Sequence, residues 1–179
     1  DALTLKNYYY SKGFLDVVIN ESYHIKDNSN KNKFVDILYR VVEGKQYHLS
    51  KVHINGNDLI SKKKITKILG LKIDSPYNPV GLNDNLYLLE NEYHNLGKLF
   101  ATITVKDEIK DSVEITIDID EGKYIYINNT RIKKKGNIDS AIVIRELNYE
   151  SGDLFSKIKV DKSSKQLREL GIFSTANIY

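Results

Sequence analysis

Hydrophobic and polar positions recur along the chain in a fixed order. An apolar run ends at Glu43-Gly44, and an alternating run, Leu49 to Ile54, begins almost at once and stops at Gly56-Asn57. The same order returns at Glu121-Gly122 and Gly136-Asn137, which lie 78 and 80 residues further along. A pattern that repeats at this period predicts tandem structural modules.

The segment between the two Glu-Gly pairs predicts one complete module. Residues 49–54 alternate as a strand, and Ser61 is placed to cap a helix that follows. A second helix is predicted by apolar residues that step by four and three positions, Leu82, Leu86, Leu89, Tyr93 and Leu96. Of the two strands that follow, the second alternates apolar residues with polar ones, which indicates a single buried face, at Val113, Ile115, Ile117 and Ile119. We therefore expect an α+β fold of the order β-α-α-β-β, a three-stranded mixed sheet covered on one face by two helices.

Partial modules flank the complete one, and we expect three domains over residues 1–45, 46–122 and 123–179. The first contains a helix over residues 1–12 and a hairpin of two strands, residues 15–25 and 34–42. The third begins with a predicted strand over residues 124–133 and continues with two helices, the first capped by Asp139 or Ser140 and the second starting at Ile158. It ends in a strand from Ser174. Because the chain begins inside a predicted helix, we also expect it to be a piece of a longer protein.

A glycine ends the last helix of every predicted module. Gly13, Gly97 and Gly171 each follow a helical pattern, and an aromatic residue comes soon after each of them. Glycine accepts the left-handed conformation that ends a helix, and the aromatic ring anchors the chain as it turns back onto the sheet.

Short joints connect the predicted modules. Only about four residues, 45–48, separate the end of one sheet from the next strand. We predict inter-domain hinges at these joints and expect so short a connection to limit how far the modules swing. The predicted hinge residues are Glu43, Gly44, Glu121 and Gly122.

Composition narrows the possible chemistry. Of the 179 residues, 41% are hydrophobic, 28% are charged and none is cysteine, which excludes disulfides, thiol nucleophiles and thiolate metal sites. No apolar run approaches the ~20 residues that a membrane-spanning helix needs. His48 and His53 are expected on opposite faces of a strand, and the acidic residues 118, 120 and 121 are typical of a solvated strand face. We therefore expect no catalytic residue, no metal site and no cofactor.

Two lysine runs, residues 62–64 and 133–135, are candidate contacts for phosphates or lipid headgroups. The net charge of +3 permits an anionic partner without favouring one. Because the first run lies in the first turn of a predicted helix, a solvated helix face is the favoured interpretation.

Backbone edges are the feature with functional potential. A three-stranded sheet leaves edge strands whose N–H and C=O groups can pair with an extended peptide. We expect peptide binding at two such strands, which contain Val17, Ile19, Glu21 and Tyr23 in one case and Ala101, Thr102, Ile103, Thr104 and Val105 in the other.

Several short motifs follow one another in a characteristic order. They are Tyr8-Tyr9-Tyr10-Ser11-Lys12-Gly13-Phe14, Tyr47-His48-Leu49-Ser50, Ser75-Pro76-Tyr77-Asn78, Gly152-Asp153 and Leu167-Arg168-Glu169-Leu170-Gly171-Ile172-Phe173. Together with the Glu-Gly and Gly-Asn pairs, this order resembles tandem POTRA (polypeptide-transport-associated) domains, most closely those of the BamA family of outer-membrane β-barrel assembly factors. The resemblance covers essentially the whole chain, as the back half of a third POTRA domain, all of a fourth and most of a fifth. The chain departs from the family pattern at residues 74–75, where Gly-Asp is usual, and at residues 97–99, where Gly-Tyr or Gly-Phe is usual.

The resemblance implies a non-catalytic scaffold in the periplasmic part of an outer-membrane protein, within a Gram-negative-type envelope. The partners that it implies are unfolded outer-membrane β-barrel proteins, accessory assembly lipoproteins and the protein's own C-terminal membrane barrel, with no nucleic acid. Pairing at an edge strand is the implied mode of binding. Two alternatives stay open: the arm of a two-partner secretion or translocation-and-assembly transporter, and, from another class, a basic module that binds lipid headgroups or nucleic acid.

Overall fold

The computed structural model describes residues 1–27, 33–133, 139–171 and 178. Its contacts divide the chain into two compact units. Unit 1 comprises Asp1–Asn55, Ile60–Leu86 and Thr104–Asp118, and unit 2 comprises Gly56–Leu59, Tyr87–Ile103 and Ile119–Tyr179. The predicted domain boundaries at residues 45 and 122 stay a prediction beside this division.

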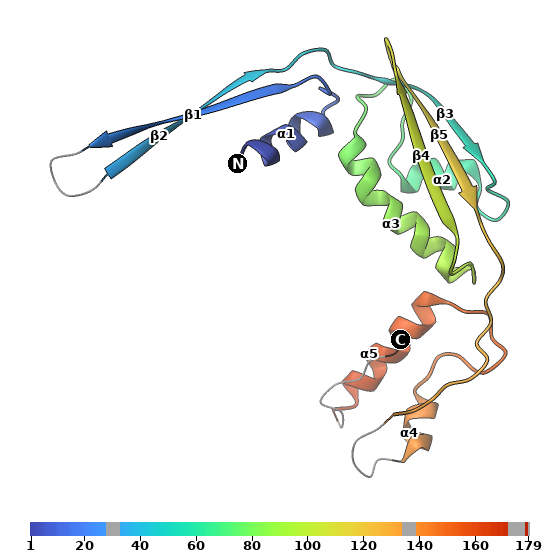
Figure 1. Cartoon of the computed structure of the whole chain (residues 1–179). Coiled ribbons are helices and arrows are strands. Elements are labelled where there is room, and N and C mark those ends of the chain that lie inside the picture. Colours follow the sequence, from blue (N-terminus) through green and yellow to red (C-terminus); the bar gives the residue numbers. More distant parts are fainter. Residues whose placement is uncertain (28–32, 134–138, 172–177, 179) are drawn as a thin grey trace. The chain divides into compact units, whose positions relative to one another are not determined.

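Ten helices and strands are found in the described part of the chain (Figure 1). In order they are α1 (Ala2–Ser11), β1 (Val18–Asp27), β2 (Lys33–Val42), β3 (Leu49–Asn55), α2 (Lys62–Ile68), α3 (Pro79–Asn95), β4 (Thr102–Ile109), β5 (Val113–Asp120), α4 (Ser140–Arg145) and α5 (Lys157–Glu169). The β-α-α-β-β order predicted for the complete module is confirmed over β3 to β5.

The strands form two sheets. β1 and β2 make an antiparallel hairpin whose register runs from Val18 opposite Val42 to Asp27 opposite Lys33. The other sheet has the order β3-β5-β4, and its central strand β5 runs parallel to β3. Only residues 110–112 connect β4 to β5, a link short enough for antiparallel neighbours alone. The predicted α+β fold with a mixed three-stranded sheet is therefore confirmed.

The core lies on one face of β5, as its alternation predicts. Val113, Ile115 and Ile117 have no exposed surface, whereas the residues between them are half-buried. The helices and their ends contribute further buried apolar side chains, among them Ile65, Leu69, Leu82, Leu89 and Tyr93. Burial of this apolar surface stabilises the three-stranded sheet and holds its edges in place.

The predicted helix ends are confirmed. The Ser61 side chain caps α2 by accepting the N–H of Lys64 at 3.3 Å, and Asp139 caps α4 by accepting the N–H of Ala141 at 2.9 Å. Gly13 and Gly97 have the positive φ angles, 86° and 78°, that the left-handed end of a helix requires.

The strand predicted over residues 124–133 is wrong. This segment forms a single β-bridge, between Tyr126 and Leu154, and no continuous strand. The reason lies in its neighbours, because β3 is held by β5 and no described residue occupies the equivalent place beside 124–133. Two predicted edge residues, Val17 and Ala101, also fall just outside β1 and β4. The strand predicted from Ser174, the Gly136-Asn137 pair and lysines 134 and 135 lie outside the described residues.

Candidate functional site

The predicted peptide-binding strand over residues 101–105 lies at a sheet edge. β4 has β5 on one side only, because the sheet order is β3-β5-β4. Thr102 and Thr104 are exposed, and Ile103 and Val105 are half-buried against the covered face. The backbone of β4 therefore has one side without a strand partner among the described residues, and peptide pairing there stays a prediction.

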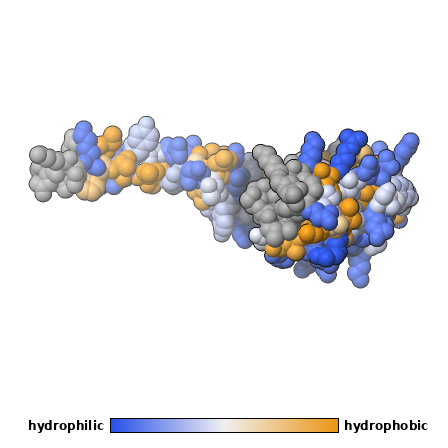
Figure 2. Space-filling model, turned by 90° about the horizontal axis from the view of Figure 1, so that it is seen from below, coloured by the Kyte–Doolittle hydropathy of each residue, from blue (hydrophilic) through white to orange (hydrophobic). Residues whose placement is uncertain are grey.

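The predicted strand of the first module is part of an exposed hairpin. Tyr23 lies opposite Ile37 and Ile25 lies opposite Val35, so these four side chains share one face. All four are more than half exposed, and Figure 2 shows apolar atoms gathered along this hairpin. Val17 differs from the rest, because it is buried.

The first joint, residues 43–49, is held by the backbone from two sides. The N–H of Tyr47 donates to the carbonyl of Gly13 at 2.8 Å, and the carbonyl of Tyr47 accepts the N–H of Tyr77 at 2.9 Å. The Tyr47 hydroxyl also donates to Asp16 at 2.7 Å, and this bond raises the pKa of Tyr47 above its usual value. The joint is therefore bonded to the helix end before it and to the turn of the following module.

The turn of the complete module closes on the same segment. The N–H of Leu49 donates to the carbonyl of Ser75 at 3.0 Å, and the N–H of Asp74 donates to the carbonyl of Leu49 at 2.8 Å. These two bonds fasten the beginning of β3 to the turn before α3.

The second joint, residues 121–127, repeats this bonding. Ile125 donates to the carbonyl of Gly97 at 2.8 Å and accepts the N–H of Phe155 at 2.8 Å. Ile127 donates to the carbonyl of Asp153 at 2.8 Å and accepts the N–H of Gly152 at 2.7 Å. In each of these bonds, the residue with the higher number lies 78 positions after the corresponding residue of the earlier module. The same period separates the two Glu-Gly pairs.

The predicted hinge residues lie beside these bonds. Gly44 and Gly122 have positive φ angles of 75° and 61°. Glu121 accepts the N–H of Leu59 at 2.8 Å, and the carbonyl of Gly122 accepts the ammonium of Lys98 at 2.9 Å. Bending at these residues stays a prediction, but both joints are bonded segments and not bare linkers.

Asp74 adopts a conformation that glycine prefers. Its φ angle is 62°, and Gly152, 78 residues later in the turn before α5, has a φ angle of 92°. Aspartate tolerates the left-handed region better than most residues, and it occupies the place where the family pattern has glycine. The turn keeps its backbone bonding despite the departure.

We expect Asp74→Gly to raise the free energy of unfolding by about 0.5–1 kcal/mol, because glycine removes the steric cost of the left-handed conformation. The urea midpoint of the whole chain measures this change. The reciprocal variant, Gly152→Asp, should lower the midpoint by a similar amount. A lower midpoint for Asp74→Gly would show that the aspartate side chain stabilises the turn.

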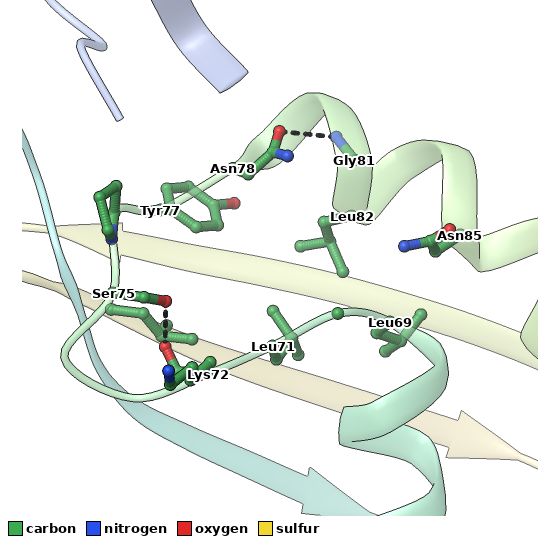
Figure 3. A pocket seen from close by; sticks show the side chains of 12 residues that line it. Leu69, Leu71, Lys72, Ser75, Tyr77, Asn78, Gly81, Leu82 and Asn85 are labelled. Carbon is green, nitrogen blue, oxygen red and sulfur yellow. Dashed lines mark hydrogen bonds between the residues drawn. The ribbon is translucent and has the colours of Figure 1, made fainter. Parts of the chain in front are cut away.

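A small hollow lies beside the first joint, between the end of α2, the beginning of α3 and the turn that connects them (Figure 3). Leu49, Leu69, Tyr77 and Leu82 are among its lining residues, and its volume is about 70 Å³. Pockets that hold small-molecule ligands usually have about 300–1,000 Å³. The hollow therefore has room for roughly two water molecules.

The candidate metal and acidic residues have local structural contacts. The described residues contain no group of three metal-ligating side chains. Asp118 accepts a hydrogen bond from Asn55 at 2.9 Å, and Asp120 accepts the N–H of Gly122 at 3.0 Å. Lys62 and Lys63 are exposed in the first turn of α2, as the solvated-face interpretation predicts. Among the described helices, none is long and apolar enough to cross a membrane.

Comparison with known proteins gives the family. Residues 47–122 match the family model of POTRA, described as a surface antigen variable number repeat. These residues are a POTRA domain. The match begins at Tyr47 in the first joint and ends at Gly122 in the second, so the bonded joints flank the POTRA domain on both sides.

Relatives extend the resemblance beyond this domain. The chain is 28% identical over 182 residues to an outer membrane protein assembly factor of Treponema pallidum, covering 98% of the chain and 22% of that protein. It is 23% identical over 181 residues to the outer membrane protein assembly factor BamA of Nitratidesulfovibrio vulgaris, covering 97% of the chain and 22% of that protein. The chain thus spans about a fifth of the length of these relatives, and the resemblance to the BamA family is confirmed.

A solved structure supports the fold. The crystal structure of Haemophilus influenzae BamA POTRA3-5 matches with a TM-score of 0.67 and 20% identity, over 97% of this chain and 69% of that one. At this identity the likeness shows the fold alone. The POTRA fold that the sequence predicts is therefore confirmed.

Proposed function

We propose that this chain is a periplasmic segment of an outer-membrane β-barrel assembly factor of the BamA kind. In this role it is a non-catalytic scaffold that binds unfolded outer-membrane proteins and accessory assembly lipoproteins. The names of the relatives support a role in outer-membrane protein assembly. Because the matches cover nearly the whole chain, they support assigning the entire segment to such a factor. The C-terminal membrane barrel of the same protein is the further partner that we infer.

The position of β4 is the observation on which the binding mode rests. β4 is an edge strand of eight residues, and its exposed threonines alternate with half-buried apolar residues. An incoming extended peptide can add its backbone to such an edge, with its side chains alternating between the two faces of the sheet. Binding through backbone bonds also suits clients of many different sequences.

Proline substitution tests this mode. Adjacent residues of a strand direct their N–H groups to opposite sides, so one of Ile103→Pro and Thr104→Pro removes an outward N–H and the other removes a bond to β5. We expect the variant that keeps its thermal midpoint to bind an apolar client peptide at least about fivefold more weakly, because it loses a backbone hydrogen bond and gains a clash. Fluorescence anisotropy with a labelled peptide from an unfolded outer-membrane barrel protein measures the affinity.

The result separates the classes of function. Unchanged affinity in the folded proline variant would contradict strand pairing at β4. A salt titration of the wild-type chain then tests the basic-module alternative, because binding to phosphates or headgroups falls steeply with salt and strand pairing does not. The exposed lysines of α2, replaced together by glutamine, provide the matched variant for that alternative.

A further inference from the structure

The end of α3 reaches a helix that follows the second joint, and all of these residues belong to unit 2. Asn95, the last residue of α3, accepts the N–H of Ile158 at its Oδ1 atom, at 2.9 Å. Ile158 is the second residue of α5, and the N-cap residue of α5, Ser156, makes no side-chain capping bond. Asn95 thus supplies the acceptor that an N-cap side chain ordinarily supplies from within the same helix.

The equivalent helix of the POTRA domain caps itself. Asn78, which lies 78 residues before Ser156, accepts the N–H of Gly81 at 2.8 Å in the first turn of α3. The later module has serine at this repeat position, and its first turn is bonded to a side chain 61 residues before Ser156. The first turn of α5 is therefore capped by a side chain of α3 and not by a residue of its own N-terminus.

Lys98 adds a second contact at the same place. It is only 7% exposed, its ammonium donates to the carbonyl of Gly122 at 2.9 Å, and it lies 3.8 Å from the centre of the Tyr124 ring. A buried cation is stabilised by such partners and is costly without them. At the corresponding helix end beside the first joint, the glycine is followed by Phe14. A lysine at this position is therefore particular to the helix end beside the second joint.

Gly97, which lies between Asn95 and Lys98 in the sequence, makes a third contact at the same place. Its carbonyl accepts the N–H of Ile125 at 2.8 Å, and a Cβ atom on Gly97 would lie 2.5 Å from the Leu154 side chain. Asn95, Gly97 and Lys98 thus contact α5, the turn before it and the second joint itself. The three contacts differ in chemistry and converge from one short segment.

We propose that Asn95, Gly97 and Lys98 form a clasp that fixes the second joint and couples the stability of α5 to the end of α3. The Glu121-Gly122 position is then a held joint, in which bending requires the cation of Lys98 to leave Gly122 and Tyr124. The clasp does not depend on what the chain binds, so its test is independent of client binding.

Hydrogen exchange on the whole chain tests the clasp. We expect Asn95→Ala to lower the exchange protection of the α5 amides about fivefold, the effect of losing one N-cap bond, and to leave the β5 amides unchanged. The matched control is Asn83→Ala, which makes the same chemical change at an exposed position of α3 and should alter neither. Equal protection of α5 in the two variants would overturn the proposal. An equal loss in α5 and β5 would also overturn it, because the effect would then be global.

A second variant tests the cation. We expect Lys98→Met, which keeps most of the apolar side chain and removes the charge, to lower the protection of the Ile125 amide and of α5 together. Lys67→Met, at an exposed position of α2, is its matched control and should change neither. If Lys98→Met leaves the second joint as protected as the control does, the cation does not hold the joint and the clasp is overturned.

Discussion

Gly56→Ala is expected to lower the free energy of unfolding by about 2–5 kcal/mol, the sum of a left-handed backbone cost and of overpacking. Gly56 ends β3 with a φ angle of 71°, and a Cβ atom there would lie 2.0 Å from the carbonyl oxygen of Ile119. Real Cβ atoms do not approach a carbonyl oxygen so closely, and this oxygen belongs to the backbone at the end of β5. The variant therefore has to displace a strand and not merely a flexible side chain.

Gly152→Ala is the matched control for this prediction. Gly152 has a φ angle of 92°, but a Cβ atom on it would meet nothing within 4 Å. The control therefore carries only the backbone cost, about 1–2 kcal/mol. Urea unfolding of both variants, followed by far-UV circular dichroism, gives the difference, which isolates the contact with Ile119. Equal losses in the two variants would mean that the end of β5 moves aside without cost.

The Gly56 contact also shows why the Gly-Asn pair at the end of β3 begins with glycine. The glycine is needed because the end of β3 lies against the backbone at the end of its parallel neighbour β5, too close for any side chain. Sequence periodicity could locate the pair and the strand end. It could not show that the neighbour is Ile119, because the contact joins residues 63 positions apart.

Local signals were sufficient for the order of helices and strands in the POTRA domain. Ser61 was identifiable as a cap, and Asp139 as one of two candidates with Ser140, because a capping side chain bonds within its own first turn. A cap supplied by a distant residue was not identifiable, because Asn95 caps a helix that begins far along the chain. One signal was available for Lys98, which stands where the family pattern has an aromatic residue, and the structure shows this lysine buried, with its ammonium bonded to the carbonyl of Gly122.

The prediction of strands from the sequence was wrong where a strand needs a neighbouring strand in order to form. Residues 124–133 alternate much as residues 49–54 do, yet among the described residues only the earlier segment has a strand beside it, in β5. Apolar alternation reports a preference for an extended backbone and a buried face. Whether a strand forms also depends on the segment that pairs with it. The pattern of a single segment carries no information about that neighbour.

The same dependence predicts that two isoleucines at one repeat position contribute very differently to stability. Ile115 on β5 has no exposed surface, whereas Ile37 on β2, 78 residues earlier, is 59% exposed. We expect Ile115→Ala to lower the free energy of unfolding by about 2–5 kcal/mol, through lost burial and the cavity left behind. Ile37→Ala should cost less than about 1 kcal/mol, because it removes mainly a cross-strand contact with Tyr23.

The pair of variants is its own control, since the chemical change and the repeat position are identical. Urea midpoints measured at two protein concentrations give both losses and detect any association. If Ile37→Ala cost as much as Ile115→Ala, the face of the hairpin that carries Tyr23 and Ile37 would have to be covered in solution. Because β5 has its apolar face covered within the domain and β2 is exposed along nearly all of its length, the difference between the two losses measures how much of a strand's stability comes from the elements packed on it.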